Sequence, residues 1–306
     1  MSAAPDPSPR QQLPKVTAVL VAYNRAPKLP RTLDSVLAQS LRDFELIISD
    51  DCSTDDTAEI CADYARRDPR IRYRRNPRNL GMPGNLNAAL LKARGEYLAI
   101  LHDGDTYRHD LLEKWAAALD RHPKAAFVFN AYAYESVERG GPSGFDRIVM
   151  PPCMDGREFL ERVFIPNWGG CPVFGTTMLR RSCFESAGPF DPRYSMNSDV
   201  EMWMRLASRY DVAYVPEPLI VISPREPDHV LKRHYWWEKT VDVRIKRMAL
   251  RIVRPKSVWG RLRFELRARW EYAWAILPPL HHRRWREVAT GFYLILTGRD
   301  ELSPPH

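Results

Sequence analysis

Short apolar runs rich in β-branched residues alternate with helix-length amphipathic segments through the first 130 residues. The runs 16–22 (VTAVLVA), 44–49 (FELIIS) and 97–101 (YLAIL) are each followed by turn residues and then by a helical pattern. Strands that alternate with helices of about 10–15 residues indicate βαβ units. The expected fold is therefore α/β, with a mainly parallel sheet flanked by helices.

The periodicity also gives provisional element bounds. Gly95 is the expected C-cap of a helix over 85–94, and residues 135–170, rich in Gly and Pro, are predicted to form long loops. From residue 229 onward the pattern is helical, with breaks at Pro255 and at Pro278-Pro279. The other expected strands are 71–74, 125–130, 173–179, 212–215 and 219–222, and the other expected helices are 29–39, 54–67, 111–119 and 199–209.

The chain divides into three parts by composition. Residues 1–14 are rich in Pro, Ser and Ala and are predicted to be a disordered tail, residues 15–228 form the α/β domain, and residues 229–306 form a basic helical extension. The segment from Lys232 to Arg286 contains sixteen Lys/Arg but only four Asp/Glu, together with six of the nine tryptophans. The five scattered cysteines form no C-x-x-C pair, which favours a reducing cytosol over a disulfide framework or a zinc site. No run reaches the ~18 apolar residues of a membrane span.

Two carboxylates follow the strand 97–101. Asp103-Gly104-Asp105 stands where open α/β sheets bind their ligands, at the carboxyl end of a strand. Carboxylates one residue apart can share Mg²⁺ or Mn²⁺, which in such sites is completed by substrate phosphates. The alternative is an ordinary polar turn.

A second acidic segment, SDDCSTDDT over residues 49–57, follows the strand 44–49. Asp55 and Asp56 are interpreted as helix-capping residues, whereas Asp50, at the end of the strand, is a candidate for accepting a hydrogen bond from the imide N–H of a base. Tyr23 and Asn24 follow the first strand and complete a polar and aromatic shelf. A Gly-rich dinucleotide fingerprint and a Walker A lysine motif are both missing, which disfavours NAD, FAD and P-loop chemistry.

In order and spacing, these segments resemble the nucleotide-binding half of a family 2 glycosyltransferase of the GT-A fold. The matching pieces are VAYNR (21–25), SDDCSTDDT, NLG…N (79–87) and GEYLAILHDGD (95–105). The segments GTTMLRRS (175–182), GPFD (188–191) and SDVEMW (198–203) are similar to the acceptor half. The resemblance covers residues 15–225.

The resemblance implies a role for each matching residue. Asp103 and Asp105 match the metal-holding D-x-D motif, with His229 as a looser match to a further ligand, and Asp199 matches the general base, with Glu201 as the next candidate. Asn85-Leu86-Asn87 lacks the arginine that many members have there, which puts a cationic contact from this helix to the donor in doubt. The implied donor-binding residues are Tyr23, Asp50, Asp51, Gly81, Asn87 and Asp103.

The expected function is inverting transfer of a sugar from a UDP- or dTDP-sugar to a hydroxyl acceptor, with Mg²⁺ or Mn²⁺ as cofactor. The acceptor is expected to be a cell-envelope or lipid-linked saccharide, with loops 135–170 and 190–198 setting specificity. The alternatives are a nucleotidyltransferase, which would need a Gly-rich cationic loop after the first strand, and a catalytically inactive basic interaction module.

The basic extension has three interpretations. Residues 229–290 can form an amphipathic platform on an anionic membrane, which would place a cytoplasmic protein peripherally on the inner face of the plasma membrane. Equally, the tryptophans can be the core of a structural appendage or a homodimer interface. Nucleic-acid binding is the least favoured, because a nucleotide-sugar enzyme accounts for the rest of the chain.

Overall fold

The protein was analysed as a computed structural model that describes residues 13–134, 150–167, 171, 173, 175–223, 229–253, 258–281 and 289. The strands are β1 (Val16–Ala22), β2 (Phe44–Asp50), β3 (Ile71–Arg75), β4 (Tyr97–His102), β5 (Thr106–Tyr107), β6 (Ala125–Tyr134), β7 (Cys153–Met154), β8 (Thr177–Arg180) and β9 (Asp211–Ile222). The α-helices are α1 (Leu29–Leu37), α2 (Thr57–Arg67), α3 (Gly84–Leu90), α4 (Leu111–Arg121), α5 (Gly156–Phe159), α6 (Arg181–Ala187), α7 (Ser198–Ala207), α8 (His229–Val253) and α9 (Val258–His281). A π-helical turn, η2 (Leu160–Phe164), continues α5, and a 3-10 segment, η3 (Pro192–Asn197), precedes α7.

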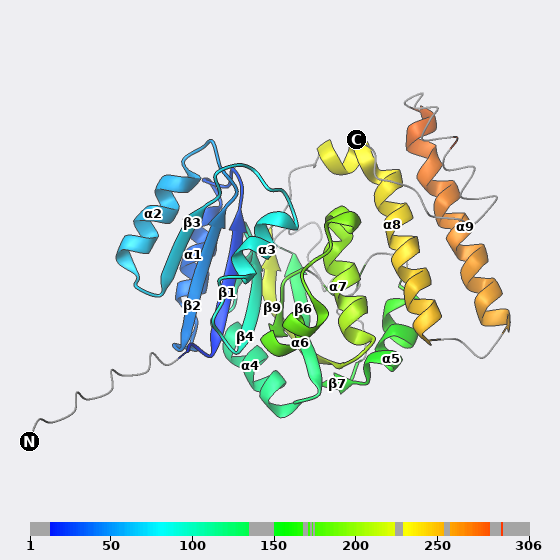
Figure 1. Ribbon diagram of the computed structural model, residues 1–306, viewed down its shortest axis with the longest axis horizontal. Coiled ribbons are helices and arrows are strands. Elements are labelled where there is room, and N and C mark those ends of the chain that lie inside the picture. Colours follow the sequence, from blue (N-terminus) through cyan, green and yellow to red (C-terminus); the bar gives the residue numbers. More distant parts are fainter. Residues whose placement is uncertain are drawn as a thin grey trace, which may run out of the picture.

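The strands form one sheet in the order β3-β2-β1-β4-β8-β6-β9-β5, with β7 paired to β9 (Figure 1). The β3-β2-β1-β4 half is parallel, as predicted. The other half is mixed: β8 runs antiparallel between β4 and β6, β6 and β9 are parallel, and β5 and β7 are antiparallel to β9. The sheet is thus Rossmann-like in its β3-β2-β1-β4 half, and the carboxyl ends of β1, β2 and β4 lie side by side.

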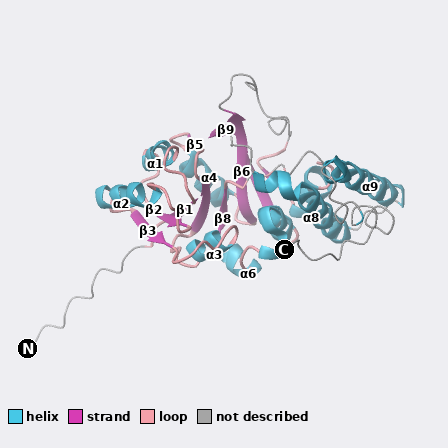
Figure 2. Ribbon diagram, turned by 90° about the horizontal axis from the view of Figure 1, so that it is seen from above, coloured by secondary structure: helices cyan, strands magenta, loops and turns pink. Residues whose placement is uncertain are grey.

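Helices cover both faces of the sheet (Figure 2). Alternate residues of β1 enter two separate cores: Val16, Ala18 and Leu20 pack with α1, α2 and α4, whereas Val19 and Val21 pack on the face that carries α3. Every residue of β1 and β2 is buried. Burial on both faces explains why these strands read as continuous apolar runs and not as alternating ones.

Several element bounds differ from the predictions. The helix expected over 85–94 ends at Leu90, and Gly95 is not its cap. A Cβ on Gly95 would lie 2.3 Å from the backbone nitrogen of Thr17, so this glycine permits the chain to pass close to β1. Part of the region predicted to be loop, 155–164, is helical because Asp155 accepts hydrogen bonds from the backbone of residues 157 and 158 and so caps α5.

The last strand is also longer than predicted. Residues 211–222 form the single strand β9, not two strands around Pro216 and Pro218. Register shifts against β6 on either side of Ala131 leave Pro216 without a partner in the ladder, whereas Pro218 stands opposite Ala131. The break expected at Pro278-Pro279 is likewise missing, because α9 continues to His281.

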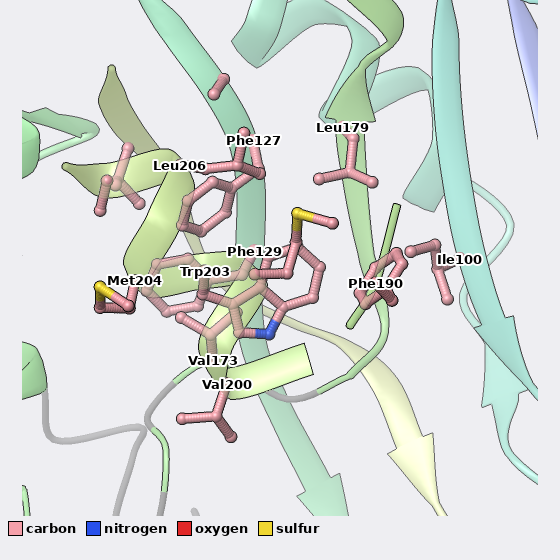
Figure 3. Packing of buried hydrophobic residues seen from close by; sticks show 14 of the residues in the cluster. Ile100, Phe127, Phe129, Val173, Leu179, Phe190, Val200, Trp203, Met204 and Leu206 are labelled. Atoms are coloured by element: carbon pink, nitrogen blue, oxygen red, sulfur yellow. The ribbon is translucent and has the colours of Figure 1, made fainter. Parts of the chain in front are cut away.

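Helix α7 is anchored by a cluster of aromatic side chains (Figure 3). The Trp203 ring is fully buried and lies 5.2 Å from the Phe127 ring of β6 and 6.0 Å from the Phe190 ring, measured between centroids. Residues four apart share one face of a helix, so burying Trp203 against the sheet turns Asp199 toward the sheet as well.

The extension packs on the half of the molecule that contains α7. Helix α8 contacts η2, η3 and α7, and α9 contacts α8. Lys246 of α8 is buried, forms an ion pair with Asp242 at 2.6 Å and lies over the Phe164 ring of η2. Both views place α9 at the end of the molecule opposite α2 (Figures 1 and 2). Among the described residues, no helix is both long and apolar enough to cross a bilayer.

Candidate active site

Three turns meet at the carboxyl edge of the sheet, one after each of β1, β2 and β4. Each contains a residue with left-handed backbone: Asn24 (φ 52°), Cys52 (φ 62°) and Gly104 (φ 96°). The side-chain oxygen of Asn24 accepts a hydrogen bond from the Thr54 backbone nitrogen at 2.8 Å. The backbone nitrogen of Asn24 donates a hydrogen bond to the Ser53 hydroxyl at 3.0 Å. Non-glycine residues in this region carry strain, and such strain is concentrated at functional sites.

Asp50 is fully buried at the end of β2. Its carboxylate accepts hydrogen bonds from the Ser53 nitrogen (2.9 Å) and the Tyr73 hydroxyl (3.1 Å), and Arg75 approaches it at 3.4 Å. Burial, together with the negative charge of Asp50, raises the pKa of Tyr73, so the hydroxyl remains a donor at neutral pH. Arg75 has the longest of these contacts and a half-exposed side chain, and its guanidinium also donates a hydrogen bond to the Ser53 carbonyl oxygen at 2.6 Å.

Asp51 holds the loop before α3. Its two oxygens accept hydrogen bonds at 2.8 Å from the backbone nitrogens of Leu80 and Gly81 and from the Asn76 side chain. Gly81 has a φ of 65°, which a glycine adopts without strain. Asp51 and Gly81 therefore shape the same turn, and direct contact of either with a donor stays a prediction.

Asn87 connects the two halves of the domain. Its amide nitrogen donates to the Phe190 carbonyl at 2.8 Å and its amide oxygen accepts from the Phe190 nitrogen at 3.0 Å. These bonds use both ends of the amide and fix the 188–191 segment over α3. The predicted donor-binding role of Asn87 stays a prediction, as does that of Tyr23, whose ring is half exposed after β1.

The two carboxylates after β4 have different surroundings. Asp103 keeps 17% of its side-chain surface exposed and pairs with Arg25 at 3.2 Å. Asp105 is only 3% exposed, accepts a hydrogen bond from the Ser223 nitrogen at 3.2 Å, and accepts one at its backbone oxygen from Thr32 at 2.8 Å. Asp103 therefore faces the open edge, whereas Asp105 ties the turn to the end of β9.

The side chains of Asp199 and His102 both lie close to Gly175. A Cβ built on Gly175 would lie 2.5 Å from Nε2 of His102 and 3.1 Å from Oδ2 of Asp199. The other carboxylate oxygen of Asp199 accepts from the Val200 nitrogen at 2.7 Å. Asp199 lies in the first turn of α7 but is not its N-cap, since that position belongs to Asn197. The fold thus brings Asp199 to the end of β4, directly beside the Asp103 turn.

Glu201 makes its contacts with Arg205 and not with the residues around Gly175. Its carboxylate is buried and forms two 2.9 Å hydrogen bonds with Arg205, which in turn bonds the backbone of residues 187–189. Glu201 therefore anchors α7 to the preceding loop. The side chain of His229, the further ligand suggested by resemblance, lies outside the described residues.

Three residues of this site escaped the sequence reasoning: Arg25, His102 and Gly175. Arg25 follows β1 and places a half-exposed guanidinium on Asp103, so a cation is present at the edge although α3 lacks one. The sequence feature that could have identified Arg25 is its place as the last residue of the VAYNR segment. His102 directly precedes Asp103 at the strand end, and Gly175 opens GTTM, but no local pattern shows that the two are in contact.

The chain matches the family model of glycosyl transferase family 2 over residues 17–187. It is 31% identical over 203 residues to TuaG of Bacillus subtilis, a putative teichuronic acid biosynthesis glycosyltransferase, with 66% of this chain and 75% of TuaG covered. The chain spans only 23–32% of the length of five other curated relatives.

Solved structures share the fold. TarS of S. aureus in complex with UDP-GlcNAc superposes with a TM-score of 0.62 at 16% identity, over 92% of this chain and 90% of the TarS chain. The mannosyltransferase PcManGT of Pyrobaculum calidifontis, in complex with GDP-Man and Mn²⁺, gives 0.61 at 20% identity, over 96% and 83%. The family model and the relatives agree, and the chain belongs to glycosyl transferase family 2.

Proposed function

We propose that the carboxyl edge of β1, β2 and β4 binds a nucleoside-diphosphate sugar, and that Asp199 activates the acceptor hydroxyl for inverting transfer. The observation that carries this proposal is the meeting of Asp199 with the end of β4. It sets a carboxylate from α7 beside the turn that holds Asp103, so that a base and a diphosphate-binding group flank one space. We further propose that residues 15–134 are the nucleotide-binding half and 135–228 the acceptor half.

The reaction follows from these positions. The Asp199 carboxylate takes the proton of the acceptor hydroxyl as the oxygen bonds to the anomeric carbon, and the bond from that carbon to the phosphate oxygen breaks. The electron pair leaves with the nucleoside diphosphate. Attack from the side opposite the leaving group inverts the anomeric centre, so an α-linked donor should yield a β-linked product, which the proton coupling constant of the anomeric centre in NMR would show.

The residues at the edge fit a divalent cation. Mg²⁺ and Mn²⁺ sites commonly use one or two carboxylates with the remaining positions taken by phosphates and water. Asp103 offers such a carboxylate at the open edge, and Asp105 fixes its turn through the Ser223 nitrogen. The described residues contain no cluster of three or more His, Cys, Asp or Glu, so donor phosphates and water would complete the coordination of the cation. A bound cation would neutralise charge that develops on the leaving diphosphate, and Arg25 supplies a second positive charge at the same place.

For the base, we propose that Asp50 accepts the imide N–H of uracil or thymine once Arg75 is displaced. Cytosine presents an acceptor at this position and would leave the carboxylate facing a lone pair, which costs about 1–3 kcal/mol. We therefore expect UMP to bind about 10–100-fold more tightly than CMP by calorimetry. A guanine nucleotide that binds more tightly than both would contradict the assignment of Asp50.

The substitution Gly175→Ala tests the close packing of His102 and Asp199 on Gly175 without removing a charged group. The new methyl would lie 2.5 Å from His102, closer than real side-chain contacts permit, and must displace Asp199 or His102. A misplacement of about 1 Å can cost about 10²-fold in rate, so we expect kcat to fall by that factor while donor affinity is retained. In the control Gly84→Ala, the methyl meets the Cβ of Leu80 at 3.1 Å, a contact that a shift of a few tenths of an ångström relieves, and kcat should stay near wild type. Equal kcat values in the two variants would refute this geometry.

We propose a cell-envelope saccharide as the acceptor. The support is TuaG, whose name assigns it to teichuronic acid biosynthesis, and it is limited to the class of acceptor. A nucleotidyltransferase is less well supported, because the turn after β1 has no glycine with which to cradle a triphosphate.

A further inference from the structure

Helix α9 uses one narrow face to pack on α8. Phe264 and Ala268, four residues apart, are buried in a small cluster with Val243 of α8. Glu265, beside them, forms an ion pair with Arg247 of α8 at 2.7 Å. These contacts fix the rotation of α9 about its axis and therefore determine which residues lie on its outer face.

The outer face of α9 is apolar. Trp259 and Trp270 are 74% and 53% exposed, and Leu262 and Leu266 between them are also exposed. At 100° per residue these four positions fall within one stripe, on the opposite side of the helix from Phe264. Two tryptophans and two leucines in one exposed stripe form a continuous apolar surface, which on a protein marks an interaction site.

Positive charge borders this stripe. Arg263 and Arg269 are exposed and fall on either side of it by the same helical spacing. The only acidic residue in 258–270 is Glu265, which is held by α8. The outer face is therefore an apolar stripe between cationic edges.

We propose that the outer face of α9 docks on an anionic membrane surface. Tryptophan prefers the headgroup level of a bilayer, leucine enters the acyl boundary, and arginine binds lipid phosphates. A second copy of the same face would instead bring arginines against arginines, so the charge pattern disfavours a symmetric dimer. Because the half with α7 lies between α9 and the nucleotide side (Figures 1 and 2), docking would hold the acceptor half near the lipid surface. This last consequence, an acceptor half held where it can reach a lipid-linked acceptor, rests on the proposed function.

Cosedimentation of the full-length chain with vesicles tests the docking surface. One set contains phosphatidylglycerol and phosphatidylcholine, the other phosphatidylcholine alone, each at low and at 1 M salt. We expect binding only to the anionic vesicles and release at 1 M salt, where screening acts within about 3 Å. Each basic residue near the surface contributes about 1 kcal/mol, so Arg263→Gln with Arg269→Gln should lower the partition coefficient about 30-fold.

Matched variants separate this surface from general basicity. Trp259→Ser with Trp270→Ser should abolish vesicle binding, whereas Arg66→Gln with Arg67→Gln, on the exposed face of α2, should change it less than twofold. Binding that is equal for neutral vesicles, or unaffected by the α9 substitutions, would overturn the proposal. So would a dimer, seen by size-exclusion chromatography, that the α9 substitutions dissociate. Nucleotide release from a soluble donor should be normal in every variant, so the proposed function is tested separately.

Discussion

Replacing Asp199 by asparagine is expected to lower the rate of sugar transfer by about 10²–10⁴-fold, the usual contribution of a general base. Asparagine keeps the shape of the side chain and the oxygen that accepts from the Val200 nitrogen. It cannot take a proton as a carboxylate does. The melting temperature and the donor affinity should therefore stay near wild type while kcat falls.

Glu201→Gln is the matched control for that variant. It lies two residues further along α7, removes one carboxylate in the same way, and breaks the ion pair with Arg205. Burial raises the pKa of Glu201 although Arg205 opposes this. We expect a loss of stability with kcat within a few fold of wild type. If Asp199→Asn keeps more than a tenth of wild-type kcat, or if Glu201→Gln loses more of it, the base has been misassigned.

Removing divalent cations is expected to reduce transfer to background. The leaving diphosphate would then lose the charge stabilisation that a metal supplies, which is worth several kcal/mol. Activity should return when Mg²⁺ or Mn²⁺ is added in excess of the chelator. Asp103→Asn should raise the metal concentration needed for half-maximal activity.

The fold should not depend on that metal. The turn that holds Asp103 is fixed by contacts within the protein, to Arg25 and to the Ser223 nitrogen, so the melting temperature in EDTA should equal that in buffer. Asp105→Ala, in contrast, should lower the melting temperature, because it removes the buried side-chain oxygen that accepts from the Ser223 nitrogen and joins the turn after β4 to the end of β9. Undiminished turnover in EDTA would remove the metal from the mechanism.

The β3-β2-β1-β4 half of the fold could be predicted because its sequence signals are local. The strand limits at Val16–Ala22 and Phe44–Asp50 follow from apolar runs that are buried on both faces. The half formed by β8, β6, β9 and β5 could not be predicted in the same way, because its strand pairing is non-local. β9 continues through two prolines only because β6 shifts register beside it, and Gly95 ends no helix because its function is a close approach to β1.

The same limit applies to the site. Asp103, Asp105 and Asp199 stand in recognisable motifs, and the fold brings Asp199 to the turn that holds the other two. The sequence does not show which way they face. Asp105 is buried beneath Asp103, Asn87 is occupied by Phe190, and Glu201 is held by Arg205. Contacts between residues more than 70 positions apart, such as Arg25 with Asp103 and His102 with Gly175, become visible only in three dimensions.

Release of free nucleotide from a panel of nucleotide sugars, with and without Mn²⁺, tests the central claim most directly. The panel pairs each sugar with uridine, thymidine, cytidine and guanosine diphosphates and compares wild type with Asp199→Asn. We expect metal-dependent release from a uridine or thymidine donor by wild type, reduced at least 10²-fold in the variant. Release that is independent of metal and unchanged in Asp199→Asn would contradict the assignment of this edge as the transfer site.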